Sequence, residues 1–190
     1  MVNIEMSDRA IIFRKIVFLT YCIVAMVFLQ KVGFGQDARE KSLGIEASAS
    51  YDYLEDIKLH FLLSYSVKQH MPFVGFEFPI SDDPVTNFGF NVGYKFFPNK
   101  NKQRFDFFFL YLLQAGSRKL YAASTVNGFS LHNLMGYGFN IHFSDKIYLV
   151  HHMAAGIENA WFNDYGSFSD LSLSFNLGFG IKIKTSKAGE

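Results

Sequence analysis

From residue 43 onward, apolar and polar residues alternate along the chain, and the alternation recurs between turn-like clusters as far as Lys184. The last segment shows it most clearly. Every odd position from Leu171 to Ile183 is a large apolar residue, while the even positions are small or polar. Because successive side chains of a β-strand point to opposite faces, this period of two predicts a strand with one apolar face. No segment of the region has the period of an amphipathic helix.

The same pattern predicts eight strands. They are expected at residues 43–53, 57–68, 74–80, 88–96, 104–114, 129–143, 147–158 and 171–183. The connections after the second, fourth and sixth strands are short, whereas those after the third, fifth and seventh, at 81–86, 116–125 and 159–168, are longer. An even number of strands with short turns at one end and longer loops at the other is typical of a bacterial outer-membrane barrel.

The composition of the polar face indicates which side meets lipid. An outer-membrane barrel is apolar outside, whereas a soluble periplasmic calyx that binds an apolar ligand is apolar inside. The polar face is mostly Gly, Ser, Asn and His, and ten of the thirteen glycines after residue 35 fall on it. Small residues fit the crowded interior of an eight-stranded barrel. We therefore expect an all-β fold, an eight-stranded antiparallel up-and-down transmembrane β-barrel.

An open sheet edge in lipid would leave backbone groups without partners, so the first and eighth strands should pair and close the sheet. Closure would bring Glu46 and Lys182 into the same part of the interior, where we expect an ion pair. Other interior charges should pair as well, because an unpaired buried charge is costly. With Phe108 and Leu110 also pointing inward, a wide pore is not expected; diffusion porins have ~16–18 strands.

The amino terminus has the features of a secretory signal peptide. Arg9, Arg14 and Lys15 precede an apolar stretch at 16–29, which is shorter than the ~20 residues that span a bilayer, and small residues follow at Gly33 and Gly35. We expect a cleaved signal peptide at 1–35, a linker at 36–42, the barrel at 43–184 and a polar tail at 185–190. We expect the signal peptide to direct export of the protein, and the barrel to reside in the outer membrane.

The overall charge and the cysteine content exclude several classes of protein. The net charge is +1 with scattered basic residues, which gives no field to hold a nucleic acid. Without the signal peptide, 14 basic and 15 acidic residues remain, and no cysteine. Disulfide frameworks and cysteine metal sites are therefore excluded, and the 34 aromatic residues are the unusual feature of the composition.

Two runs, Gly-Tyr-Lys-Phe-Phe-Pro-Asn-Lys at 93–100 and Phe-Asn-Leu-Gly-Phe-Gly-Ile-Lys-Ile at 175–183, make the chain resemble the small outer-membrane β-barrel proteins of the OmpX and OmpA transmembrane-domain type. The resemblance covers the signal peptide and residues 43–184. It implies the outer membrane of a Gram-negative-type cell and insertion by the barrel-assembly machinery. The polar tail departs from the usual terminal aromatic residue, so the insertion signal should be internal, with Phe179 as a candidate. No peptidoglycan-binding module is expected.

Candidate chemistry is sparse. Ser130 and His132 share one face of the sixth strand, and Glu158 or Glu77 could supply an acid, as in a serine hydrolase that acts on lipid. Such residues also fill a polar interior, so no catalytic residue is assigned, and a lipid-modifying hydrolase that uses Ser130 and His132 is kept as an alternative. No cofactor is expected.

A histidine metal site is not expected either. His151 and His152 are adjacent on a strand and point to opposite faces. His60, His132 and His142 share the inner face, but they come from different strands, and the sequence does not place them at one height.

The loops offer weak binding candidates. Arg118 and Lys119 could contact lipopolysaccharide phosphate, while Trp161 and Tyr165 could contact a partner or belong to an interfacial girdle, which we favour. We expect a noncatalytic monomer with a structural or surface-interaction role, whose partners are outer-membrane lipid and lipopolysaccharide. The soluble calyx is the third hypothesis.

Overall fold

A computed structural model describes residues 37–38, 41–52, 57–80, 86–99, 101–102, 104–121, 125–163 and 166–184. All of these residues belong to one compact unit, Gln36–Glu190. The expected signal peptide at 1–35 and the tail at 185–190 lie outside the described residues. Within the described part of the chain, no helix has the length and apolar character needed to cross a membrane.

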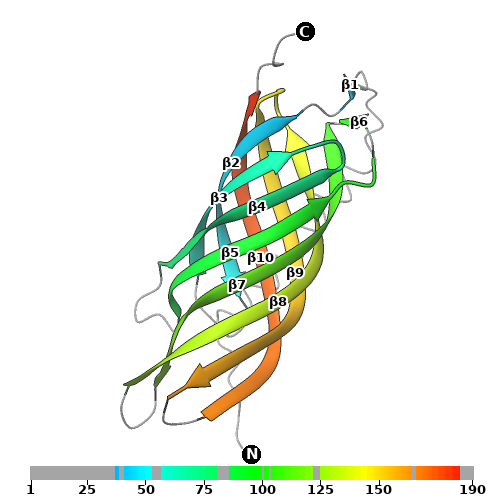
Figure 1. Cartoon of the computed structure of the whole chain (residues 1–190). Coiled ribbons are helices and arrows are strands. Elements are labelled where there is room, and N and C mark those ends of the chain that lie inside the picture. Colours follow the sequence, from blue (N-terminus) through cyan, green and yellow to red (C-terminus); the bar gives the residue numbers. More distant parts are fainter. Residues whose placement is uncertain are drawn as a thin grey trace, which may run out of the picture. The chain divides into compact units, whose positions relative to one another are not determined.

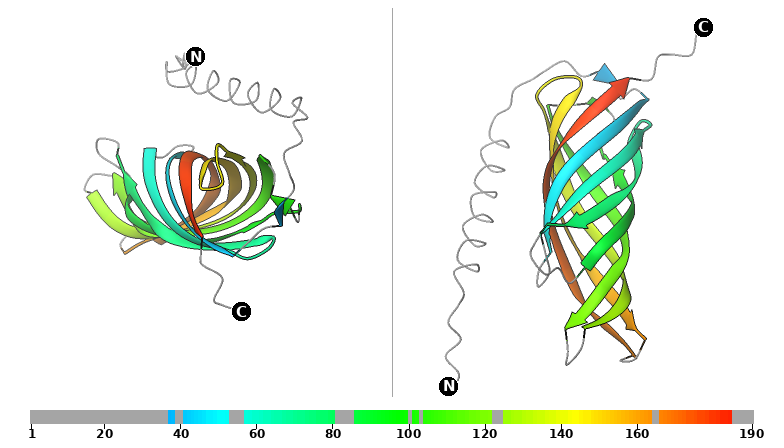
Figure 2. Two further views of the ribbon diagram at one scale, coloured as in Figure 1. Left: turned by 90° about the horizontal axis from the view of Figure 1, so that it is seen from above. Right: turned by 90° about the vertical axis from the view of Figure 1, so that its left-hand side faces the viewer.

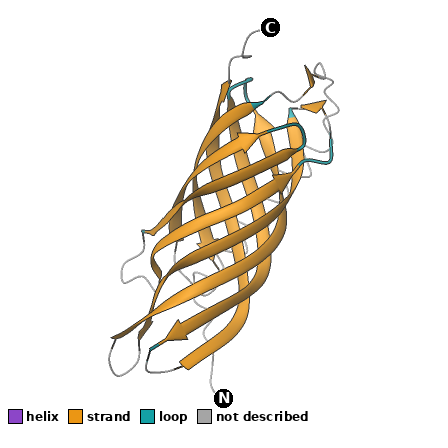
Figure 3. Cartoon of the chain, in the orientation of Figure 1, coloured by secondary structure: helices purple, strands orange, loops and turns teal. Residues whose placement is uncertain are grey.

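The described elements are strands (Figures 1 and 3). They are β1 (Asp37–Ala38), β2 (Ser42–Asp52), β3 (Ile57–Ser66), β4 (His70–Pro79), β5 (Thr86–Phe96), β6 (Asn101–Lys102), β7 (Phe105–Tyr121), β8 (Thr125–His142), β9 (Ile147–Phe162) and β10 (Gly166–Lys184). The eight long strands close into a barrel in the order β10-β2-β3-β4-β5-β7-β8-β9, while β1 and β6 pair separately. Each neighbouring pair is antiparallel, so the predicted up-and-down barrel and its closure are confirmed.

The register fixes the tilt of the strands. Following paired residues from Glu46 once around the barrel leads to Asp170 on β10, but the partner of Glu46 on β10 is Gly180, ten residues away. With the usual strand rise and spacing, such a stagger over eight strands tilts them by about 40°. A strand of ten or eleven residues then rises roughly 25 Å, which equals the apolar band of an outer-membrane barrel.

Most of the large apolar residues face outward, and most of the residues that face inward are small or polar. Along β2 the even positions are buried and the odd positions are exposed, and β3 and β4 repeat the alternation. Leu63, Phe76 and Phe179 are 47–58% exposed, whereas Glu46, Lys58 and other polar side chains inside are nearly inaccessible. This orientation excludes the soluble calyx, whose apolar residues would line the interior.

Glycines on the inner face leave room for large side chains opposite. Gly93 is the clearest case, because the ring of Phe73 lies against it. A Cβ added at Gly93 would stand 2.7 Å from carbons of that ring. The small residues that the sequence placed inside thus determine how closely the interior packs.

The last four barrel strands are longer than the sequence pattern predicts. β7 to β10 have 16 to 19 residues, against 10 or 11 in β2 to β5. The predicted loops at 116–125 and 159–168 were therefore wrong, because pairing continues to Tyr121↔Thr125 and Phe162↔Gly166. Residues 116–121, 125–130, 158–162 and 166–173 form a projecting sheet, most of which continues past β2 to β5 at one end, with β5 pairing as far as Arg118 (Figure 2). We call this end the loop end and the other the turn end.

Candidate functional site

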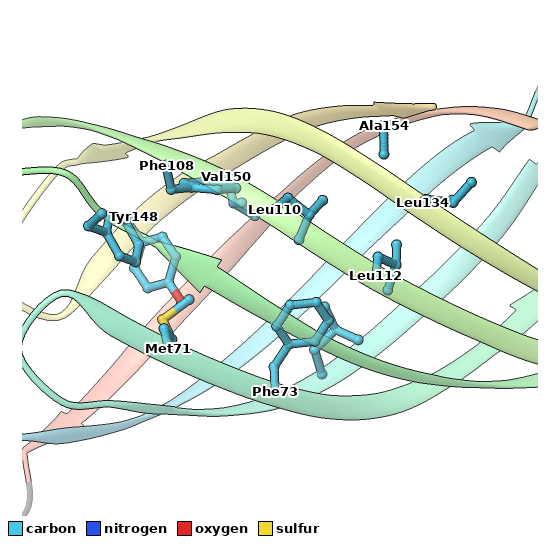
Figure 4. Packing of buried hydrophobic residues seen from close by; sticks show 11 residues of the cluster. Met71, Phe73, Phe108, Leu110, Leu112, Leu134, Tyr148, Val150 and Ala154 are labelled. Atoms are coloured by element: carbon cyan, nitrogen blue, oxygen red, sulfur yellow. The ribbon is translucent and has the colours of Figure 1, made fainter. Parts of the chain in front are cut away.

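An apolar cluster fills the barrel interior toward the turn end (Figure 4). Met71, Phe73, Phe97, Phe108 and Tyr148 are at most 3% exposed. They come from the turn-end halves of β4, β7 and β9 and, for Phe97, from the position directly after β5. Toward the loop end, the cluster continues with Leu62, Leu110, Leu112, Leu134, Val150 and Ala154. Side chains thus occupy the lumen, as in other eight-stranded barrels.

A buried ion pair lies within this cluster. Lys95 Nζ contacts Glu46 Oε1 at 2.8 Å and Oε2 at 2.6 Å, and Tyr148 donates to Oε1 at 2.8 Å. The same ammonium lies 5.5 Å from the ring centroid of Phe73 and 5.0 Å from that of Phe108. The partner expected for Glu46 was Lys182, whose Nζ lies 5.4 Å from the ring centroid of Tyr148. A direct pair of Glu46 with Lys182 stays a prediction.

A second polar network lies nearer the loop end. Lys58 Nζ is 2.8 Å from Asp52 Oδ2 and 3.6 Å from Glu77 Oε1, so two carboxylates share one ammonium. Gln114 Nε2 donates to Glu77 at 2.8 Å. His60 bridges the Ser50 hydroxyl at 2.6 Å and the Asn91 amide at 2.8 Å. The charges of Lys58, Asp52 and Glu77 thus compensate one another, as a closed interior requires, while Asp52 Oδ1 and Asn91 Oδ1 have no hydrogen-bond partner among the described atoms.

The structure separates the residues of the hydrolase alternative. His132 Nδ1 is 3.1 Å from the hydroxyl of Ser172, and the hydroxyl of Ser130 has no hydrogen-bond partner among the described atoms. His132 Nε2 is 3.7 Å from Glu158 Oε1, while Glu77 belongs to the Lys58 network. Ser130, His132 and Ser172 are 0–5% exposed. They face the lumen, where no lipid chain on the outer surface reaches them.

The histidines are dispersed. His151 lies with Phe139 and Leu177 on the outer face, its ring centroid 5.1 Å from that of Phe139, whereas His152 points inside. His142 Nε2 is 3.0 Å from Asp106 Oδ2 near the turn end. Among the described residues, no three His, Cys, Asp or Glu side chains are placed to hold a metal ion.

The projecting sheet carries the predicted binding candidates on both faces. Arg118 lies in β7 rather than in a loop, faces inward and forms an ion pair with Glu158. Its guanidinium carbon lies 5.4 Å from the ring centroid of Phe168, which stacks on Phe162 at 5.9 Å. The sequence offered no sign of these contacts, because the strands that supply them were predicted as loops.

Trp161 lies in β9, on the outer face of the projecting sheet. It stacks on Phe129 of β8, with ring centroids 5.9 Å apart, and is 44% exposed. Lys119 alternates with Arg118 and so belongs to this outer face too. Tyr165 lies outside the described residues.

One edge of the projecting sheet has no neighbouring strand among the described residues. β10 pairs with β2 only from Ser174 onward, although it begins at Gly166. Lys182 N donates to Lys146 O on the β9 side, so the odd residues of β10 direct their N–H and C=O to the other side. Ser167 and Ser169 therefore offer backbone N–H and C=O groups at the edge, whereas the Leu171 N–H donates to Asp170 Oδ1 at 2.7 Å. Asp170 is the one charged residue in 166–173, although charges commonly protect such edges.

No family model and no curated protein matches this sequence. Among solved structures, the N-terminal β-barrel domain of Pseudomonas aeruginosa OprF has a TM-score of 0.58 at 10% identity, over 76% of this chain and 98% of that one. The chain shares the fold of the OprF barrel domain. The designed protein TMB2.3 has a TM-score of 0.42 at 17% identity over 81% of this chain and 100% of its own. Neisserial surface protein A has a TM-score of 0.39 at 11% identity over 80% and 100%.

Proposed function

We propose that this protein is a noncatalytic outer-membrane β-barrel, exported by the signal peptide at 1–35, that inserts as a monomer and acts at the cell surface. The supporting observation is the outer face of the barrel. Exposed Leu, Ile, Phe and Tyr side chains cover it all around, over strands that rise roughly 25 Å, the height of an outer-membrane apolar band. The interior is closed by the apolar cluster and the ion pairs, which favours a structural or surface role over diffusion of solutes.

The surface role belongs to the projecting sheet. In outer-membrane barrels the segments that extend furthest from the apolar band face outward. Here these segments are the long β7–β8 and β9–β10 hairpins, so the loop end is the outward one. The projecting sheet, some 6 to 8 residues longer than the other strands, then rises roughly 15–20 Å above the bilayer. The β10 edge, which has no neighbouring strand in the described part of the chain, suits the addition of an extended segment from another protein, with hydrogen bonds along the backbone. Asp170 on the inner face favours a basic side chain opposite it.

Cell fractionation with heat-modifiability tests the location. The full chain is expressed, outer and inner membranes are separated, and unboiled and boiled samples are compared on a gel. We expect the protein in the outer-membrane fraction and a mobility shift on boiling, since a closed barrel stays folded in detergent. A soluble periplasmic protein with no shift would overturn the proposal.

Edge addition is tested with two extended peptides of alternating Val and Thr, one with a central Arg and the other with a central Glu. The Arg peptide should bind the wild type and Ser169→Ala alike, and Ser169→Pro at least tenfold more weakly. Proline removes an N–H directed to the edge and leaves the β9 pairs in place, while both variants lose the Ser169 bond to Asn159. Equal binding to Ser169→Pro, or no binding of either peptide to the wild type, would exclude strand addition.

A further inference from the structure

Exposed basic side chains surround the turn end of the barrel. Lys68 lies in the turn between β3 and β4, Arg104 immediately before β7 and Lys146 immediately before β9, while Lys41 precedes β2. Each turn-end connection and the start of the first barrel strand thus contribute one. We call these four residues the basic ring.

The basic ring borders the apolar band on the outer face. Lys41 stands two residues before the outward Leu43, Arg104 precedes Phe105, and Lys146 precedes Ile147. Lys68 follows the exposed Tyr65. Long basic side chains at such a border lay their stems along apolar surface and extend their charges toward phosphates. The ring is therefore at the height of lipid headgroups.

The positive charge of this end does not reflect an overall basic protein. Residues 36–190 carry 14 basic and 15 acidic side chains. Among the described side chains at the turn end, Asp145 is the one exposed carboxylate, because Asp106 is buried against His142. The chain segments between strands at the loop end, 53–56, 81–85, 122–124 and 164–165, contain five carboxylates and no Lys or Arg by sequence. The two ends of the barrel therefore differ in charge.

We propose that the basic ring binds the phosphate groups of anionic phospholipid headgroups in the leaflet at the turn end. The proposal rests on the membrane location proposed above. A basic residue close to an anionic membrane surface is attracted strongly enough to enrich an anionic lipid about fivefold. Four such residues distributed around the rim select anionic over zwitterionic lipid and hold the turn end at the headgroup level of that leaflet.

Lipid selectivity in nanodiscs tests the inference. The protein purified from expressing cells is placed in nanodiscs of phosphatidylcholine with phosphatidylglycerol as the minor lipid, and the lipids retained after release are counted by native mass spectrometry. One variant carries Lys41→Gln, Lys68→Gln, Arg104→Gln and Lys146→Gln. The matched control keeps every charge, with Lys41→Arg, Lys68→Arg, Arg104→Lys and Lys146→Arg.

We expect phosphatidylglycerol enrichment in the wild type and in the charge-conserving control, and a loss of about fivefold or more in the glutamine variant. Equal enrichment in the glutamine variant, or no enrichment in the wild type, would overturn the inference. So would displacement of the lipid by excess inorganic phosphate, which would make the ring a site for soluble anions. Heat-modifiability of the same samples separates the two proposals. If the wild type does not insert, the proposed membrane location is refuted. If it inserts but shows no lipid selectivity, only the proposed headgroup site is refuted.

Discussion

Lys95 and Glu46 form a two-point contact inside the barrel, with Nζ–O distances of 2.8 and 2.6 Å, and the two side chains are 0% and 1% exposed. Tyr148 adds a third bond to the same carboxylate. The phenyl rings of Phe73 and Phe108 flank the ammonium. Attraction between the charges therefore acts in an apolar setting, where the loss of either partner leaves an uncompensated charge.

Removing one partner should destabilise the barrel more than removing both. Lys95→Met leaves Glu46 buried without its cation and should cost about 3–5 kcal/mol of unfolding free energy. Glu46→Gln combined with Lys95→Met should recover most of that loss. Urea unfolding in lipid vesicles, followed by loss of the heat-modifiable band, measures both. Equal losses in the single and double variants would show that the charge pair is not what stabilises this region.

The apolar cluster should keep the barrel from conducting ions. In planar bilayers we expect no steady conductance from the wild type, because Phe73 and Phe108 close the lumen on both sides of Lys95. Phe73→Ala with Phe108→Ala should open an ion path. Phe76→Ala is the matched control, because Phe76 is on the same strand as Phe73 but 47% exposed on the outer face, and this variant should show no conductance. Conductance of the wild type equal to that of the double variant would refute the closed interior.

The period-two pattern predicted the strands and their faces because the residue types differ sharply across the sheet. Where large apolar residues alternate with Gly or Ser, as in 171–183, the prediction and β10 agree in orientation. The pattern failed at 116–125, where both faces of the extended strands are mixed. There Ser117 and Lys119 face outward, as Trp161 does on β9, and this mixture has the composition of a loop. β7 and β9 are extended by backbone pairing, which cannot be predicted from residue composition.

Interior partners could not be read from the chain because they depend on register between distant strands. Glu46 and Lys95 are 49 residues apart and meet because closure and stagger bring β2 and β5 to the same height. His132 likewise bonds Ser172, 40 residues away, rather than Ser130 on its own strand. The alternation of residues along each strand correctly placed these side chains inside the barrel. It does not tell at which height along the barrel axis each side chain lies.

Gly93 should not tolerate a side chain while Phe73 is present. Gly93→Ala places a methyl group against that ring and should cost about 1–3 kcal/mol by overpacking. Adding Phe73→Leu should recover part of the loss. Gly166→Ala meets no atom within 4 Å, and with φ of +79° its cost should be about 1 kcal/mol from the backbone alone. Urea unfolding of the four proteins tests this, and an unchanged Gly93→Ala would contradict the packing.

Ser130, His132 and Ser172 should have no catalytic role. Replacing each by Ala should leave the lipid A and phospholipid of expressing cells unchanged by mass spectrometry, since all three side chains face the lumen. Loss of the His132–Ser172 bond should lower stability by about 1 kcal/mol. Labelling of either serine by a fluorophosphonate probe, or a lipid change that disappears in His132→Ala, would revive the hydrolase hypothesis.

Arg118 and Lys119 are adjacent but should behave differently, because they lie on opposite faces of β7. Arg118→Ala leaves Glu158, which is 4% exposed, beside its cross-strand neighbour Asp170, and should cost about 3 kcal/mol. Removing the carboxylate as well, with Glu158→Ala, should recover much of the stability. Lys119→Ala should change stability by less than about 0.5 kcal/mol and lower the amount of lipopolysaccharide that co-purifies, since its ammonium is on the outer face. If Arg118→Ala instead reduced lipopolysaccharide association with stability unchanged, the ion pair with Glu158 would not hold Arg118 on the inner face.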